Sequence, residues 1–358
     1  MTEAARLWRQ LEGAGLVSGE MPPQPAYTPW FVRLIQGIAG WLAAWCVLGI
    51  LGLMLAPVVH SLFEEGAEGV AGTLGVLLLF SAWRLLRGEP QDFREQAGLA
   101  VSLAGQVLLA TALHDWWRDS LTWLGWGVLQ AGLAWHMPHA VHRLTSAFIA
   151  CLSLTAALAK TALIWFTPSL AVMIMAALWL SENRWFLYGH RIRPWAYAVT
   201  LALLCLHGFS LFSLQEGAGL AVDGPLHPPV PGTHRVNEGM MILAWVGTVW
   251  TLMQRNGVSG VSLRGCAILS GALLVSAFNH AAPGFAVAWL ILILGFAGGN
   301  KVLLGLGFAA FWIYLGRFYY LLDSTLLLKG GAMMTIGLLL LCARLILRRM
   351  PGGEVHEH

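Results

Sequence analysis

Long apolar runs separated by short polar connections are the dominant pattern of this chain. Inside a bilayer every backbone amide has to be bonded within the protein, so an apolar run of about 20 residues is expected to form a spanning helix. The runs lie near 31–57, 70–86, 96–113, 121–136, 145–166, 168–181, 194–214, 239–254, 264–279, 284–298, 301–316 and 325–347. The pattern predicts an all-α, polytopic transmembrane helical bundle of about 12 spans, or 10–12 if the short runs 168–181 and 284–298 are tilted, re-entrant or broken.

The composition supports a lipid environment. Hydrophobic residues make up 58% of the chain and charged residues only 11%, with a mean hydropathy of +0.68, whereas soluble domains carry about 25% charged residues. The 18 tryptophans suit the membrane interface, where the ring is buried and the N–H stays hydrated. A net charge of +3 is too small to indicate a nucleic-acid partner, so the expected partner is the lipid bilayer.

The basic residues are distributed asymmetrically. With the N-terminus inside and alternating spans, 16 of the 21 Lys and Arg residues fall in inner connections and four in outer ones, and Lys160 lies within a span. This bias follows the positive-inside rule and places both termini in the cytoplasm. We therefore expect a cytoplasmic segment at 1–29 with an amphipathic helix over Glu3–Leu16, a transmembrane domain at 30–349, and a cytoplasmic tail at 350–358.

Several spans carry a polar side chain near their outer ends, at similar depth. These residues are Lys160, His207, Asn279, His280, Arg317 and Lys329. If their spans are neighbours, they form a cationic pocket for an anionic lipid or a small anion, because guanidinium and ammonium groups bind phosphate and carboxylate. Two structural explanations stay open: Lys160 extends towards the interface near Trp165, and His207 is a hydrogen-bonded core histidine.

The stretch 316–329 is the densest polar cluster beside an apolar run. It contains Arg317, Tyr319, Tyr320, Asp323 and Lys329. Asp323 or Ser324 is placed to cap the following helix, and the positive dipole at that helix start would add to an anion site. The alternative interpretation is an aromatic belt at the interface together with an ordinary helix cap.

Other candidate chemistry is weaker. His136, His139 and His142 share a helical spacing, but a proline interrupts it and no carboxylate or cysteine lies nearby, so we expect no metal site. Gln106 and Gln130 lie in the middle of consecutive antiparallel spans, which predicts a hydrogen bond between the two helices. Nucleotide-binding loops, zinc-protease motifs and nucleophile elbows are absent from the sequence, so we expect no cofactor, and whether the chain is an enzyme is open, with a non-enzymatic role favoured.

Three parts of the chain are similar to a known family. They are Pro29–Arg33 leading into Gly40–Ala44, then Glu182–Phe186, and then Gly299–Gly305 running through Tyr319–Tyr320 and Ser324–Lys329. These stretches resemble the bacterial inner-membrane family called domain of unknown function 4401, with Gly330 where a serine is expected. The resemblance implies a bacterial inner membrane and a possible multi-span partner from the family called domain of unknown function 2157, and it transfers no catalytic residue.

Three functions are compatible with these observations. The first is transport or handling of an anionic solute or lipid through the polar cluster near the outer face. The second is a non-catalytic membrane subunit that binds a multi-span partner. The third is a membrane-embedded transferase acting on a lipid-linked substrate, with Asp323 or His280 as the general base.

Overall fold

The computed structural model of the 358-residue chain describes residues 3–17, 67–87, 92–116, 120–216, 230–278 and 284–321, together with a few isolated positions. Within these ranges every regular element is a helix. The predicted runs 31–57 and 325–347 lie outside the described ranges, apart from scattered positions.

The described helices follow the apolar runs closely. They are α1 (Glu3–Gly13), α3 (Ala67–Leu86), α4 (Asp92–Trp116), α5 (Ser120–His136), α6 (Ala140–Ala157), η1 (Ala162–Phe166), α7 (Thr167–Leu180), α8 (Glu182–Trp185), η2 (Phe186–Tyr188), α9 (Gly189–Glu216), α10 (Thr233–Arg255), α11 (Leu263–Phe278), α12 (Phe285–Ala297) and α13 (Lys301–Leu321). Most predicted runs within the described ranges coincide with one of these helices, so the all-helical fold is confirmed. The run 145–166 is an exception, because a turn at 158–161 divides it between α6 and η1, and η1 continues into α7. A helix is also present within the predicted amphipathic segment near the N-terminus, as α1.

Three helical stretches of the described chain are long and apolar enough to cross a membrane. They are Gly69–Leu86 in α3, Ala140–Ala157 in α6, and Ala162–Leu180 across η1 and α7. The apolar parts of the other helices are shorter, such as Phe285–Ala297 and Lys301–Gly316. A membrane protein fits these helices, whereas the span count of about 12 and the cytoplasmic location of both termini stay predictions.

The two runs expected to be irregular differ from ideal spans in different ways. The chain enters α7 through the 3₁₀ helix η1, and Pro168 lies at the start of α7, where its missing N–H costs little. The helix α12 is only 13 residues long. Its residues Ala286, Val287, Ala288 and Leu290 are fully buried, so the first half of α12 packs against other helices, whereas Phe296 near its end is exposed.

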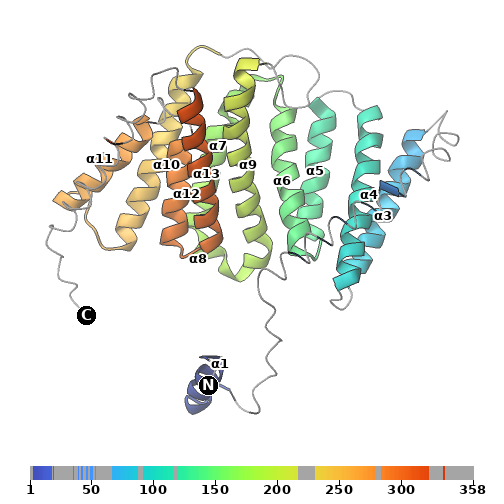
Figure 1. Ribbon diagram of the computed structural model, residues 1–358, viewed down its shortest axis with the longest axis horizontal. Helices are drawn as coiled ribbons and strands as arrows, with labels where there is room; N and C mark the ends of the chain where they lie inside the picture. Colours follow the sequence, from blue (N-terminus) through green and yellow to red (C-terminus); the bar gives the residue numbers. More distant parts are fainter. Residues whose placement is uncertain are drawn as a thin grey trace.

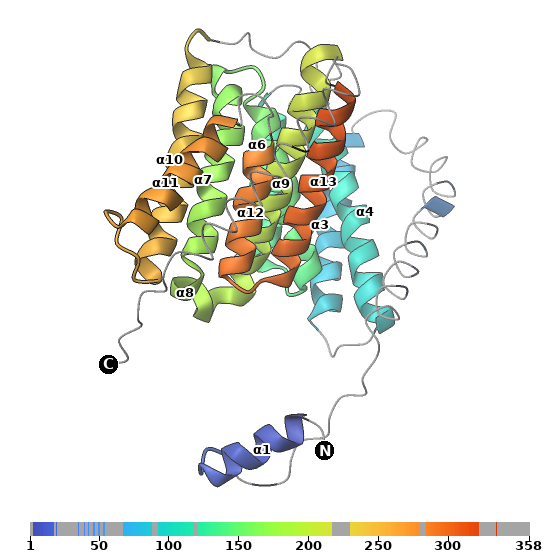
Figure 2. The ribbon, with the colours of Figure 1, turned by 60° about the vertical axis from the view of Figure 1, so that its left-hand side comes forward.

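The helices stand side by side in an extended row (Figure 1). α3 and α4 form one edge of the row, α10 and α11 lie towards the other, and α9 stands between them, as the rotated view also shows (Figure 2). Close pairs are α3 with α4, α5 with α6, and α12 with α13, while α6 packs on α9. In the first pair, a Cβ atom on Gly75 would lie 2.9 Å from the carbonyl oxygen of Gly105, so glycine is required for this close backbone approach.

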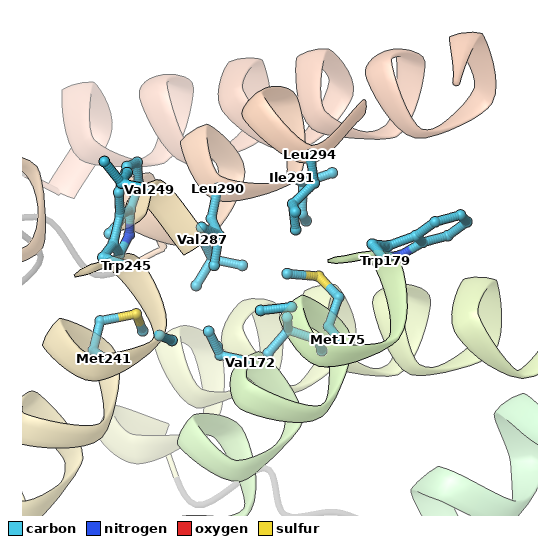
Figure 3. Close-up of a cluster of buried hydrophobic side chains, with 14 of the residues drawn as sticks. Val172, Met175, Trp179, Met241, Trp245, Val249, Val287, Leu290, Ile291 and Leu294 are labelled. Carbon is cyan, nitrogen blue, oxygen red and sulfur yellow. The ribbon is translucent and has the colours of Figure 1, made fainter. Parts of the chain in front are cut away.

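The largest apolar core joins α7, α10 and α12. Figure 3 shows Val172 and Met175 from α7 facing Trp245 from α10 and Val287 and Leu290 from α12. The residues from α7 and those from α12 are more than 100 positions apart in the sequence. Their mutual burial fixes the position of α12, and the last turn of α12, which ends at Ala297, forms part of the wall of a groove.

One end of the bundle collects basic residues, and we call it the arginine end. α6, α9 and α13 begin there and α7 and α10 end there, with α8 at the lower edge in Figure 1. Arg143 donates to the carbonyl oxygen of His190 over 2.8 Å, and Arg255 donates to the carbonyl oxygen of Leu180. The basic connections predicted to share one side therefore do meet in space, and the assignment of that side to the cytoplasm stays a prediction.

Candidate functional site

A groove of about 1270 Å³ opens at the arginine end, between the ends of α7 and α10 and the pair α12 and α13. The lining is polar at one end of the groove and apolar at the other. Polar residues at the arginine end, which we call the rim, are Glu182, Asn183, Arg193, Arg255 and Asn256. Apolar lining residues that lie further along α12 and α13 are Trp289, Leu292, Phe308 and Phe311. The groove thus has one charged end and one apolar end, aligned along the helix axes.

The rim is held together by charge-assisted hydrogen bonds. The Nη2 atom of Arg193 lies 2.9 Å from Oε1 of Glu182, and the two side chains are 48% and 20% exposed. The guanidinium of Arg255 donates to the carbonyl oxygen of Leu180, the last residue of α7. This bond satisfies a terminal carbonyl that has no partner inside its own helix. It also fixes a positive charge at the mouth of the groove.

The stretch Glu182–Phe186, one of those that carry the family resemblance, builds this rim. It forms α8, which turns the chain from α7 into α9. Trp185 is buried, and its indole N–H donates to the carbonyl oxygen of Leu178 over 2.9 Å, so the turn is anchored to α7. Glu182 and Asn183, which precede this anchor, line the groove.

A second of the resembling stretches, beginning at Gly299, lies beside the groove and contributes Leu304 to its lining. Gly299 has a positive φ of 62°, which favours glycine. The Oδ1 atom of Asn300 accepts hydrogen bonds from the backbone N–H groups of Val302 and Leu303, each over 3.1 Å. Asn300 is therefore the N-cap of α13. It also accepts a 2.9 Å hydrogen bond from the hydroxyl of Tyr197, which ties α13 to α9.

The apolar part of the groove is largely aromatic. Phe311 makes edge-to-face contacts with Trp289 and Phe285, with ring centroids 5.6 Å apart in each case. Phe296 and Phe308 also line the groove and are 80% and 57% exposed. Exposed aromatic side chains beside an open apolar groove are typical of a surface that contacts hydrocarbon chains.

A separate network of polar side chains is buried between α4, α5 and α6. The predicted hydrogen bond is present: Nε2 of Gln130 donates to Oε1 of Gln106 over 2.9 Å. The network extends to His142, whose Nε2 lies 2.5 Å from the hydroxyl of Ser102 and 3.2 Å from Nε2 of Gln106. Its Nδ1 lies 3.2 Å from the hydroxyl of Ser146. Sequence reasoning missed this part, because His142 was considered only with its neighbouring histidines.

This network is closed to ligands. Ser102 and Gln130 are fully buried and His142 is 3% exposed. A serine hydroxyl beside an imidazole is the arrangement of a nucleophile and its base, but here no substrate reaches it. We assign the network a structural role, in which it joins α4 to α5 and α6.

The three histidines do not act together. His136 is exposed, His139 faces Glu95 over 3.7 Å, and His142 points into the core. Across the described part of the chain, no group of three or more His, Cys, Asp or Glu side chains is placed to hold a metal ion.

The predicted outer cluster is only partly within the described chain. Lys160 is exposed in the turn that joins α6 to η1, so the prediction that it lies within a span was wrong. His207 is buried in α9 with Nδ1 3.2 Å from the carbonyl oxygen of Leu203. Arg317, Tyr319 and Tyr320 belong to the last turns of α13. Asn279, His280, Asp323 and Lys329 lie outside the described residues.

The helices that carry the described members of this cluster are neighbours. α6 packs on α9 and α13 contacts α9, and the hydroxyl of Tyr314 donates to the carbonyl oxygen of Leu204 over 3.4 Å. α9, which carries His207, therefore lies between α6, the helix that precedes Lys160, and α13, which carries Arg317. That their side chains share one pocket stays a prediction.

The family comparison agrees with the resemblance in the sequence. A family model described as "Domain of unknown function (DUF4401)" matches residues 29–350. No curated protein and no solved structure gives a significant match to the chain. All the stretches that carry the resemblance, including the two that contribute to the groove lining, lie within the matched range.

Proposed function

The chain belongs to the DUF4401 family, and from that premise we propose that it is a multi-pass inner-membrane protein that binds and handles an amphiphile in the groove at the arginine end. The observation that carries the proposal is the polarity of the groove, which is charged at the rim and aromatic further in. An amphiphile has the same polarity, with a charged head and a hydrocarbon chain. The sequence also led us to expect handling of a lipid, but through the polar cluster near the outer face, whereas the groove lies at the arginine end.

The direction of the groove matches a lipid of the inner leaflet. The predicted topology places the arginine end in the cytoplasm, where the positive-inside rule expects it. A lipid of that leaflet has its headgroup at this interface and its chains directed towards the bilayer centre. In the groove, its head would meet Arg193 and Arg255, and its chain would follow Leu292 and Phe308.

The lining favours binding over bond-making chemistry. Glu182 is the only carboxylate among the described lining residues, and it is paired with Arg193. No histidine or cysteine belongs to the described lining. A transferase needs a base close to its substrate, so handling of an intact amphiphile is the better-supported function. Binding of a multi-span partner and an anion site formed by Lys160, His207 and Arg317 stay separate proposals.

Photo-crosslinking tests the proposal directly. The full chain is reconstituted in nanodiscs that contain a trace of phosphatidylglycerol with a diazirine near the end of one acyl chain. Illumination is expected to label peptides within 289–311, because that segment carries much of the apolar wall. Labelling spread over all membrane-facing helices in proportion to their exposure would reject the groove as a binding site.

A blocking variant sharpens the test. Ala297 lines the groove and is exposed, so Ala297→Trp places an indole inside the groove near its charged end without disturbing the core. Labelling of 289–311 is expected to fall, because the indole competes with the lipid for this part of the groove. Ala309→Trp is the matched control, because Ala309 is also exposed but is not part of the lining. Equal labelling in the two variants would contradict the proposal.

A further inference from the structure

We propose that the rim of the groove recognises the phosphodiester headgroup of an anionic lipid. Arg255 and Arg193 would bind the phosphate, and Glu182 would compete with it for Arg193. The inference rests on the proposed function, since it names the headgroup of the amphiphile that the groove binds. It extends that function from the acyl chain to the chemistry that selects one lipid among many.

Selection has to take place at the rim, because the apolar part of the groove cannot supply it. An acyl chain that leaves the bilayer for an apolar groove exchanges one hydrocarbon environment for another, so it gains little from the hydrophobic effect. Lipids with the same chains differ only in their headgroups. The polar contacts at Glu182, Arg193 and Arg255 are therefore the part of the site that distinguishes one lipid from another.

The charges of the rim match a phosphodiester. Its described lining contains two guanidinium groups and one carboxylate, which leaves one positive charge in excess. A phosphodiester carries one negative charge and would neutralise it. Guanidinium groups suit this ligand because their N–H donors form a planar fork that matches two phosphate oxygens. Asn183 and Asn256 lie on the same rim and offer amide groups to the rest of the headgroup.

The carboxylate of Glu182 occupies the place beside Arg193 that the phosphate would take. The carboxylate lies 2.9 Å from the guanidinium that the phosphate would approach, and Arg193 is 48% exposed. Ion pairs with this degree of exposure are weak and exchange partners readily. Gly298 borders the same carboxylate: a Cβ atom there would lie 3.7 Å from Oε2 of Glu182. The end of α12 therefore lies beside the carboxylate that the phosphate would replace.

Two opposite variants give the test. Arg255→Gln removes a charged contact and is expected to weaken phosphatidylglycerol binding by about tenfold or more. Glu182→Gln removes the competitor and is expected to strengthen it severalfold. A residue with a merely structural role would not produce a gain in affinity when it is substituted. Binding is read from competition by unlabelled phosphatidylglycerol against the diazirine lipid on the full chain in nanodiscs.

Matched controls separate local chemistry from net charge. Arg184→Gln makes the same charge change in α8, at a residue outside the groove lining. Glu95→Gln is the control for Glu182→Gln, because it also removes one carboxylate charge, at a residue that faces His139 and lies outside the groove lining. Both are expected to leave phosphatidylglycerol binding unchanged. Arg255→Lys, which keeps the charge but not the planar fork, is expected to bind with intermediate affinity.

The choice of competitor lipid distinguishes recognition of the headgroup from binding of the acyl chain. Diacylglycerol with the same chains lacks the phosphate, so its binding should respond to neither Arg255→Gln nor Glu182→Gln. Equal responses with both lipids would overturn the headgroup inference and leave the acyl groove intact. Failure of any lipid to compete would overturn both. Displacement by glycerol phosphate as efficient as by the lipid would show a soluble phosphate compound as the ligand and also overturn the inference.

Discussion

The buried network at His142 makes the sharpest stability prediction. We expect His142→Leu to destabilise the fold although leucine suits an apolar core. The imidazole has hydroxyl or amide partners on both ring nitrogens, from Ser102 and Gln106 on α4 and Ser146 on its own helix. Leucine would leave the buried hydroxyl of Ser102 and its neighbours with fewer partners and no access to water.

The expected loss can be estimated from two terms. The two hydrogen bonds between helices contribute about 1 kcal/mol together, since such bonds inside membranes average about 0.6 kcal/mol each. The hydroxyl of Ser102 would keep the hydrogen bond from Nε2 of Gln106 but lose the acceptor for its own buried proton, which adds about 1–3 kcal/mol. The sum is a loss of about 2–4 kcal/mol. Gln130→Leu should cost less, because Oε1 of Gln130 already lacks a hydrogen-bond partner and its removal relieves that penalty.

Unfolding of the purified protein, followed by tryptophan fluorescence during a denaturant or thermal titration, measures the difference. His136→Leu is the control, because His136 is exposed at the end of α5. It should behave like the unaltered chain. If His142→Leu were as stable as His136→Leu, the network would not hold α4 against α6 and the estimate above would be wrong.

Three further predictions concern the helix contacts and the topology. Gly75→Val should destabilise the protein by about 1–3 kcal/mol in the same unfolding measurement, because the valine side chain would meet the backbone of α4. Gly132→Val is the control and should not produce a comparable loss, because a side chain at Gly132 would point into open space. Asn300→Ala should cost about 1 kcal/mol or more through loss of the α13 cap, and unchanged stability would contradict the assignment of that cap. In a cysteine-free background, a cysteine at Ser259 should react with an impermeant maleimide only after the cells are opened, whereas one at Lys160 should react in intact cells. The reverse result would invert the predicted orientation.

The sequence predicted the helices well because their formation depends on local physics. Apolar runs need internally bonded backbones in lipid, and the runs within the described chain are helical except for 145–166, which a turn at 158–161 interrupts. The bond between Gln106 and Gln130 was also predictable, since consecutive spans are antiparallel and adjacent. His142 was not, because its spacing from His139 suggested a shared face whereas the break before α6 directs it into the core.

The groove could not be predicted from the sequence because it joins distant segments. Arg255 and Glu182 are more than 70 positions apart and meet only through the packing of α10 on α7. In the sequence, both belong to charged connections that are expected simply to face water. The one usable signal was the stretch Glu182–Phe186, which supported the family resemblance without indicating what it lines.

The burial of α12 has a consequence for how the protein is assembled. Its 13 residues span about 20 Å, less than the roughly 30 Å of a hydrocarbon core. Such a helix gains little by entering lipid alone, and Ala286, Val287 and Ala288 have no exposed surface in the finished fold. The ribosome delivers it after α7 and α10 and before α13. We therefore expect its insertion to depend on a site formed by the earlier helices, so that a nascent chain stopped at this point would hold α12 by protein contacts rather than by lipid.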